Sequence, residues 1–92
     1  MAVCRIIETR AIPAQYDQVT ELLGIGDGPP PGAQLHVAAV ADDGTIRVLE
    51  VWDSREEAER FTERVRAARE EVGVPGPPSI AYMDVHSLRV PM

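Results

Sequence analysis

The segment LHVAAVADDGTIRVLEVWDSREEAERF, residues 35–61, decides the fold of this chain. It contains two apolar runs of strand length, residues 35–41 and 45–52. Between them stands Asp42-Asp43-Gly44, and Asp and Gly accept the positive φ that a tight turn requires. The segment therefore predicts a β-hairpin of two antiparallel strands.

A helix is predicted directly after the hairpin. Ser54 stands three residues before Glu57 in the S-x-x-E pattern of a capping box, in which each side chain binds a free backbone N–H. Gly73 ends the helix, and Pro75 stands just beyond it. Apolar residues recur at spacings of three and four along this helix: Ala58, Phe61, Val65, Ala68 and Val72. This stripe predicts that one side of the helix packs against the sheet.

The flanking sequence supplies two more strands and one more helix. Residues 3–8 and 80–88 predict the outer strands, and Pro13 predicts the start of a helix that Gly24 ends. A loop with three successive prolines, residues 24–32, leads into the hairpin. The order β-α-β-β-α-β predicts an α+β, ferredoxin-like fold: a four-stranded antiparallel sheet with two helices on one face.

Length and composition limit the possible functions. The chain is expected to form one domain, residues 1–92, and its net charge of −6 argues against nucleic acid and anionic membrane surfaces as partners. The absence of lysine excludes Schiff-base chemistry, and the single cysteine, Cys4, excludes an intramolecular disulfide. Two histidines without a cysteine or carboxylate cluster predict no metal site. Residues 1–5 carry no leader pattern, so we expect a cytoplasmic protein.

The strands place apolar residues on both faces of the predicted sheet. In the second strand, Leu35 and Val37 share one face, while Ala38 and Val40 share the other. Two helices can cover only one face, and a domain of this size buries little surface by itself. We therefore expect the second face to pack against the sheet of another copy, which gives a homodimer.

Two segments resemble a known superfamily. Residues 31–38, PGAQLHVA, resemble a "PPG…HVA" segment that leads into the second strand, and residues 48–61, VLEVWDSREEAERF, resemble its "VW-x-S" signature and following helix. Both are typical of the dimeric α+β barrel superfamily, in particular small antibiotic-biosynthesis-monooxygenase-like proteins of actinobacteria. The resemblance spans nearly the whole chain. It implies a homodimer that needs no cofactor and binds an apolar or aromatic metabolite.

The superfamily includes cofactor-free quinone-forming monooxygenases, polyketide cyclases, muconolactone isomerases and haem-degrading enzymes, and fold analogy does not choose among them. Haem-degrading relatives carry a histidine on the second helix as the iron ligand. This chain has none there, which argues against haem degradation. Many monooxygenase-type members also place a histidine on that helix, at the position where Phe61 stands here, and this departure weakens a monooxygenase assignment.

Three residues are candidates for acid–base chemistry. His36 and His86 are the side chains expected to titrate near neutral pH, although either could instead be a histidine bonded within the sheet or at the dimer contact. Glu50 is the third candidate, as a buried carboxylate whose raised pKa would let it act as an acid. The alternative for Glu50 is a salt bridge to Arg5 or Arg47.

Aromatic residues are the candidates for binding the metabolite. Trp52 ends the third strand, where a cleft between sheet and helices is expected to open, and its alternative role is in the core. Tyr82 alternates with Asp84 and His86 on the last strand, a row that either relays a proton or forms the polar rim of the dimer interface. The candidate ligand-binding residues are Trp52, Phe61, Tyr82 and Tyr16.

Together these patterns predict a small dimeric protein that binds an apolar or aromatic metabolite. It would act as a cofactor-free monooxygenase, cyclase or isomerase of secondary metabolism, with His36 as the general base. The alternative is a non-catalytic ligand-binding or assembly module of the same fold. A cavity of roughly 300 Å³ or more, apolar with a few converging polar groups, would favour the enzyme, whereas a solid core would favour the module.

Overall fold

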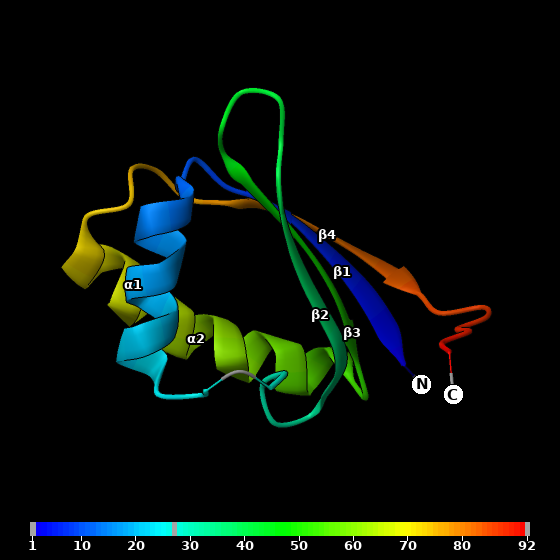
Figure 1. Cartoon of the computed structure of the whole chain (residues 1–92). Helices are drawn as coiled ribbons and strands as arrows, with labels where there is room; N and C mark the ends of the chain where they lie inside the picture. The colour runs from blue at the N-terminus through cyan, green and yellow to red at the C-terminus, as the bar shows by residue number, and fades with distance from the viewer. Residues whose placement is uncertain (1, 27, 92) are drawn as a thin grey trace.

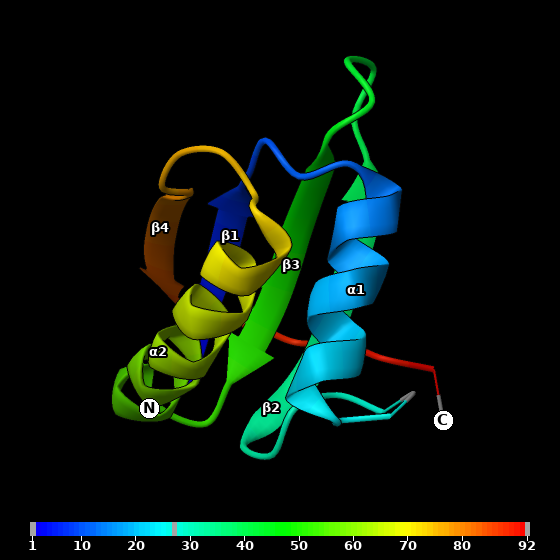
Figure 2. The same ribbon diagram turned by 90° about the vertical axis from the view of Figure 1, so that its left-hand side faces the viewer.

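The computed structural model describes residues 2–26 and 28–91, and its elements follow the predicted order (Figure 1). Two helices, α1 (Pro13–Leu23) and α2 (Arg55–Val72), lie side by side on one face of the sheet (Figure 2). The sheet is antiparallel throughout, in the order β2-β3-β1-β4. Its strands are β1 (Val3–Glu8), β2 (Ala33–Val40), β3 (Ile46–Trp52) and β4 (Ser79–Asp84). The predicted α+β, ferredoxin-like fold is confirmed.

Local side-chain and turn chemistry fixes the predicted turn and helix ends. Between β2 and β3, Gly44 adopts a φ of 84°, and its N–H donates to the carbonyl of Ala41 at 2.9 Å. At the start of α2, the backbone N–H of Glu57 donates to Ser54 Oγ at 3.2 Å. The helix ends where Gly73 adopts a left-handed φ of 86°. The hairpin turn and the serine cap are therefore confirmed.

The last strand is shorter than predicted. β4 ends at Asp84 rather than at Leu88. Asp84 pairs with Val3, which is the first residue of β1, so the neighbouring strand offers no further ladder. One more hydrogen bond, from the N–H of Val85 to the carbonyl of Ala2 at 3.0 Å, closes the pairing. A strand ends where its partner ends, whatever its own propensity.

The two faces of the sheet differ in what covers them. Trp52 and Phe61 lie between sheet and helices, with ring centroids 5.5 Å apart, in a buried core cluster. On the opposite face, Val37, Leu49 and Met83 are 45%, 37% and 47% exposed. The chain beyond β4 runs on this second side (Figures 1 and 2). The helix-covered face is therefore the one that can build an enclosed site.

Neither helix in the described part of the chain is long and apolar enough to cross a membrane.

Candidate functional site

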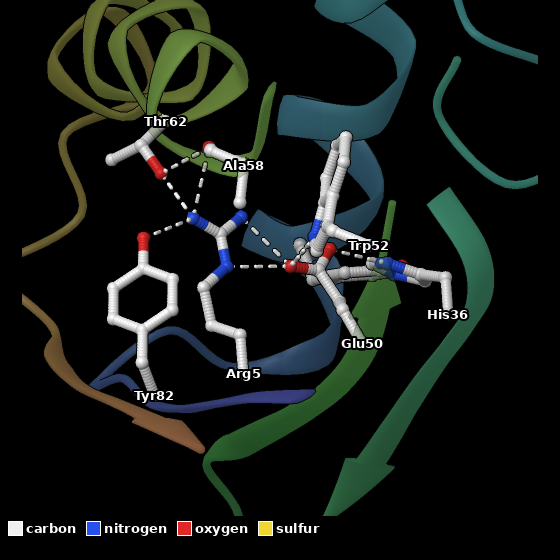
Figure 3. Close-up of polar contacts among 8 residues, drawn as sticks. Arg5, His36, Glu50, Trp52, Ala58, Thr62 and Tyr82 are labelled. Carbon is white, nitrogen blue, oxygen red and sulfur yellow. Dashed lines mark hydrogen bonds and ion pairs between the residues drawn. The ribbon is translucent and has the colours of Figure 1, made fainter. Parts of the chain in front are cut away.

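A row of polar residues crosses the sheet beneath the helices. The strand register pairs His36 of β2 with Glu50 of β3, Glu50 with Arg5 of β1, and Arg5 with Tyr82 of β4. Directly paired residues project from the same face of a sheet, so one side chain from each strand joins the row. Figure 3 shows these four side chains side by side, with Tyr82 and Arg5 near Ala58 and Thr62 of α2 and with Trp52 beside Glu50.

Glu50 is the centre of the row. Its side chain is 2% exposed. Oε1 accepts hydrogen bonds from Arg5 Nε at 2.8 Å and Trp52 Nε1 at 3.0 Å, and lies 2.7 Å from Arg5 Nη2. Oε2 lies 2.7 Å from His36 Nδ1. Both oxygens of this buried carboxylate are therefore bonded, which offsets the loss of hydration.

Arg5 joins the sheet to helix α2. The residue is 1% exposed, and its Nη1 donates to the carbonyl of Ala58 at 3.0 Å, to the hydroxyl of Thr62 and to the hydroxyl of Tyr82 at 3.3 Å (Figure 3). Of the two arginines considered as partners for Glu50, the structure selects Arg5. Arg47 lies instead 3.7 Å from a carboxylate oxygen of Asp43, near the hairpin turn.

The pKa of Glu50 is lower than that of an ordinary glutamate. Burial raises its pKa, but the hydrogen bond with His36, the charge of Arg5 and the hydrogen bond from Trp52 together outweigh burial. The predicted raised pKa is therefore wrong, because burial came with a positive partner and donors on both oxygens. Glu50 is a carboxylate at neutral pH and acts by accepting hydrogen bonds rather than by giving up a proton.

Tyr16, on α1, extends the row through His36. Its hydroxyl lies 2.7 Å from His36 Nε2, and the two rings are stacked with centroids 6.2 Å apart. Because the Glu50 carboxylate can only accept, the hydrogen of a neutral His36 lies on Nδ1, and Nε2 accepts from the Tyr16 hydroxyl. Burial raises the pKa of Tyr16, and the negative charges of Glu50 and Asp17 add to this effect. The phenol therefore keeps its proton at neutral pH, and a continuous chain of hydrogen bonds runs from Tyr16 to Glu50.

A cavity of about 510 Å³ lies between the sheet and the two helices. Its wall is mostly apolar and includes Ile7, Val19, Leu23, Phe61 and Val65. The hydrogen-bonded row opens onto it through Arg5, His36, Glu50, Thr62 and Tyr16. The volume exceeds the roughly 300 Å³ typical of the smallest ligand sites, and the mixture of apolar wall and few polar groups suits a small-molecule site. The interior between the sheet and the helices is therefore hollow rather than filled by side chains.

Four of the predicted site residues, His36, Glu50, Phe61 and Tyr16, line this cavity. The other three occupy different surroundings. Trp52 is fully buried in the core behind Glu50 and is not part of the cavity wall, and the Tyr82 hydroxyl accepts from Arg5 outside that wall. His86 lies exposed at a bend beyond β4. The predicted row of Tyr82, Asp84 and His86 on one strand is therefore wrong, since the strand ends at Asp84.

Arg5 and Thr62 belong to the site but were not among the predicted site residues. Arg5 had a signal in the sequence, because it stands between Val3 and Ile7 on the alternation that faces the helices. A charged residue on the buried face of a strand needs a partner, and Arg5 was one of the two arginines predicted as a partner of Glu50. Thr62 had no such signal, because a threonine inside a helix commonly bonds its own backbone, as it also does here to Ala58 at 3.0 Å.

Among the described residues, no group of three or more His, Cys, Asp or Glu side chains is arranged to hold a metal ion.

Several solved structures share this fold. One is a protein from Chloroflexus aurantiacus J-10-fl, provisionally described as an antibiotic biosynthesis monooxygenase, with a TM-score of 0.68 and 22% identity over 98% of each chain. The chain has an antibiotic-biosynthesis-monooxygenase-like fold. A protein of unknown function from Nitrosomonas europaea matches with a TM-score of 0.72 and 15% identity, covering 99% of this chain and 95% of that one. A monooxygenase from Streptomyces coelicolor, solved in complex with nanaomycin D, matches with a TM-score of 0.56 and 24% identity, covering 99% of this chain and 92% of that one. No protein-family profile and no curated protein matches the sequence.

Proposed function

We propose that this chain is a cytoplasmic, cofactor-independent monooxygenase of secondary metabolism that oxidises an aromatic, phenol-bearing metabolite. The observation that carries the proposal is the apolar cavity of about 510 Å³ that ends on the hydrogen-bonded row of Tyr16, His36 and Glu50. The likeness in fold to a monooxygenase solved with nanaomycin D supports this class of reaction and ligand. The apolar wall suits the rings of such a ligand, and the polar end suits its hydroxyl group.

In the proposed reaction, His36 is the base. Its Nε2 takes the proton of the ligand hydroxyl by way of Tyr16, while Nδ1 stays bonded to Glu50. The Glu50 carboxylate stabilises the imidazolium that forms, and Arg5 holds that carboxylate in place. The ligand phenolate then reacts with molecular oxygen. A phenol and one O₂ give a quinone and one water, so the reaction needs no external reductant.

The test compares two histidine variants with the wild type. Binding of 1-naphthol is measured by calorimetry, and oxygen uptake with the same compound is measured with an electrode. His36→Gln is expected to bind the naphthol but to lose a factor of about 10²–10⁴ in oxygen uptake, the usual contribution of a general base. His86→Gln is the matched control, because that histidine is exposed beyond β4, and it is expected to behave as wild type.

Equal oxygen uptake in the two variants would refute the role of His36. Binding of naphthol without any oxygen uptake by the wild type would identify a non-catalytic ligand-binding module. Failure of 1-naphthol to bind would refute the proposed ligand class.

We further propose that the exposed sheet face pairs with the same face of a second copy. Leu49 lies on this face opposite Val37 of β2 and Ile6 of β1, and it is 37% exposed despite its position in the middle of the sheet.

Light scattering is expected to give about 20 kDa, twice the 10.1 kDa of the chain. Leu49→Glu is expected to give the monomer mass. Leu22→Glu, at a half-exposed leucine on α1, is the matched control and is expected to stay dimeric. A monomer mass for the wild type would refute the dimer.

A further inference from the structure

The cavity has a second polar end, far from the row that contains His36. Arg69, in the last turn of α2, and Thr9, directly after β1, both belong to its wall. Arg69 is seven residues beyond Thr62 on the same helix, which places the two about 10 Å apart along the helix axis. The cavity is therefore bounded by the hydrogen-bonded row at one end and by these two residues at the other.

The guanidinium of Arg69 is held by neutral groups. Its Nη1 donates to Thr9 Oγ1 at 2.8 Å, and its Nη2 donates to the carbonyl of Gly76 at 3.2 Å. Within the described chain, no carboxylate oxygen lies within ion-pair distance of this side chain. Burial lowers the pKa of Arg69, which reflects the loss of hydration around a charge that no acidic side chain offsets. A guanidinium has five N–H donors, so several remain available to a ligand.

Thr9 offers a second donor at the same place. Its Oγ1 accepts from two groups, the N–H of Ala11 at 3.1 Å and Nη1 of Arg69 at 2.8 Å. The hydroxyl is thus used as an acceptor on both sides, and among the described residues nothing accepts its own hydrogen. Thr9 is 8% exposed, so leaving its hydroxyl hydrogen without an acceptor is unfavourable. A ligand in the cavity could supply that acceptor.

The other charged side chains at this end do not neutralise Arg69. Arg66 bonds to Glu63 at 3.2 Å in a pair that is mostly exposed. Glu70 also lines the cavity, but it is exposed and does not reach the guanidinium within ion-pair distance. The enclosed part of this end therefore presents one uncompensated positive charge together with a hydroxyl donor.

We propose that Arg69 and Thr9 bind the carboxylate of the ligand, so that the metabolite is an aromatic acid whose hydroxyl-bearing ring reaches the His36 end. This inference rests on the proposed function, because it assumes that the cavity holds an aromatic ligand. A carboxylate accepts two N–H groups from one guanidinium and a further hydrogen bond from a hydroxyl, which matches the donors present. The site would select acids over neutral aromatic molecules of the same shape.

The experiment compares 2-naphthoic acid with 2-naphthamide at neutral pH, where the acid is ionised and the amide is its neutral counterpart. Dissociation constants are measured by calorimetry for the wild type, Arg69→Gln and Arg60→Gln. The wild type is expected to bind the acid about ten- to a hundred-fold more tightly than the amide. Arg69→Gln is expected to bind the acid and the amide with equal affinity. Arg60→Gln, an exposed position on the same helix outside the cavity, is expected to keep the wild-type preference.

A second measurement does not depend on the folding of Arg69→Gln, which also removes a bond to the Gly76 loop. In wild-type protein, the Nε–H resonance of Arg69, assigned with the charge-retaining Arg69→Lys, is expected to shift on adding naphthoate and not on adding naphthamide. Equal affinities for acid and amide in the wild type, a preference that survives in Arg69→Gln, or an unmoved Arg69 resonance would overturn the carboxylate site. If neither compound binds, the proposed function fails and this inference fails with it.

Discussion

Replacing Glu50 by glutamine tests the interaction that organises the site. The substitution keeps the shape of the side chain but removes the charge that faces Arg5, and both side chains are 2% exposed. Breaking a buried ion pair by neutralising one partner destabilises a protein by about 3–5 kcal/mol, because the other charge stays buried without compensation. A domain of 92 residues has a free energy of unfolding of about 5–14 kcal/mol in total. Glu50→Gln is therefore expected to remove a large fraction of the stability.

The assay is urea unfolding followed by circular dichroism, and the control is the same substitution in an exposed pair. Glu59 accepts from Arg55 Nε at 2.9 Å, a distance close to that between Glu50 and Arg5, but its side chain is 56% exposed. Glu59→Gln is expected to change the free energy of unfolding by at most about 1 kcal/mol. If Glu50→Gln were no more destabilising than Glu59→Gln, the buried pair could not be what holds the row together.

The pH dependence of the same variants gives an independent check. The pKa of Glu50 is lowered in the folded protein, so its contribution to stability is present above the ordinary glutamate pKa of about 4.3. That contribution is lost as the pH falls through the lower pKa of the folded state. The stability difference between wild type and Glu50→Gln is therefore expected to be constant near neutral pH and to shrink below about pH 4.3. A difference that grew on acidification would contradict the lowered pKa.

Two further predictions concern other parts of the site and fold. Gly32→Ala is expected to lower the free energy of unfolding by more than Gly44→Ala in urea titrations. Both glycines have positive φ, of 91° and 84°, but only at Gly32 would the new Cβ meet another atom, Oε2 of Glu57 at 2.5 Å. Equal losses would show that the carboxylate moves aside freely. In Tyr82→Phe, the single remaining tyrosine is Tyr16, and the ultraviolet absorbance of tyrosinate is expected to appear only above the usual phenol pKa of about 10. A titration at or below that value would contradict the raised pKa.

The elements of the fold were predictable where local chemistry determines them. The Asp-Asp-Gly turn and the serine cap act within a few residues, so the sequence was sufficient to place the hairpin and α2. The pairing of His36 with Glu50 also follows from the hairpin, because Val40 pairs with Ile46 and the register then runs without interruption to His36 and Glu50. The end of β4 was not predictable, because it depends on where β1 begins.

The side-chain contacts that give the site its chemistry could not be predicted from the sequence. The bond from Arg5 to Thr62 joins residues 57 positions apart, and the bond from Tyr16 to His36 depends on how α1 lies over the sheet. Neither contact leaves a periodic signal, since helix periodicity reports which side of a helix is buried and not which strand residue it meets. The direction of the pKa shift of Glu50 was mispredicted for the same reason, because burial alone raises that pKa and only the distant partners reverse it.

The stability of the fold does not by itself explain the polar row. Replacing a buried ion pair by apolar residues of similar volume is often neutral or stabilising by about 1–4 kcal/mol, so a sheet with leucine and methionine at Glu50 and Arg5 would fold at least as well. What such a sheet would lose is the acceptor that fixes the hydrogen of His36 on Nδ1 and leaves Nε2 facing Tyr16. The row also opens onto a cavity of about 510 Å³ that apolar packing could have filled. A buried charge and a hollow interior at the same place both work against stability, and the combination is understandable if the site holds a ligand and moves one of its protons.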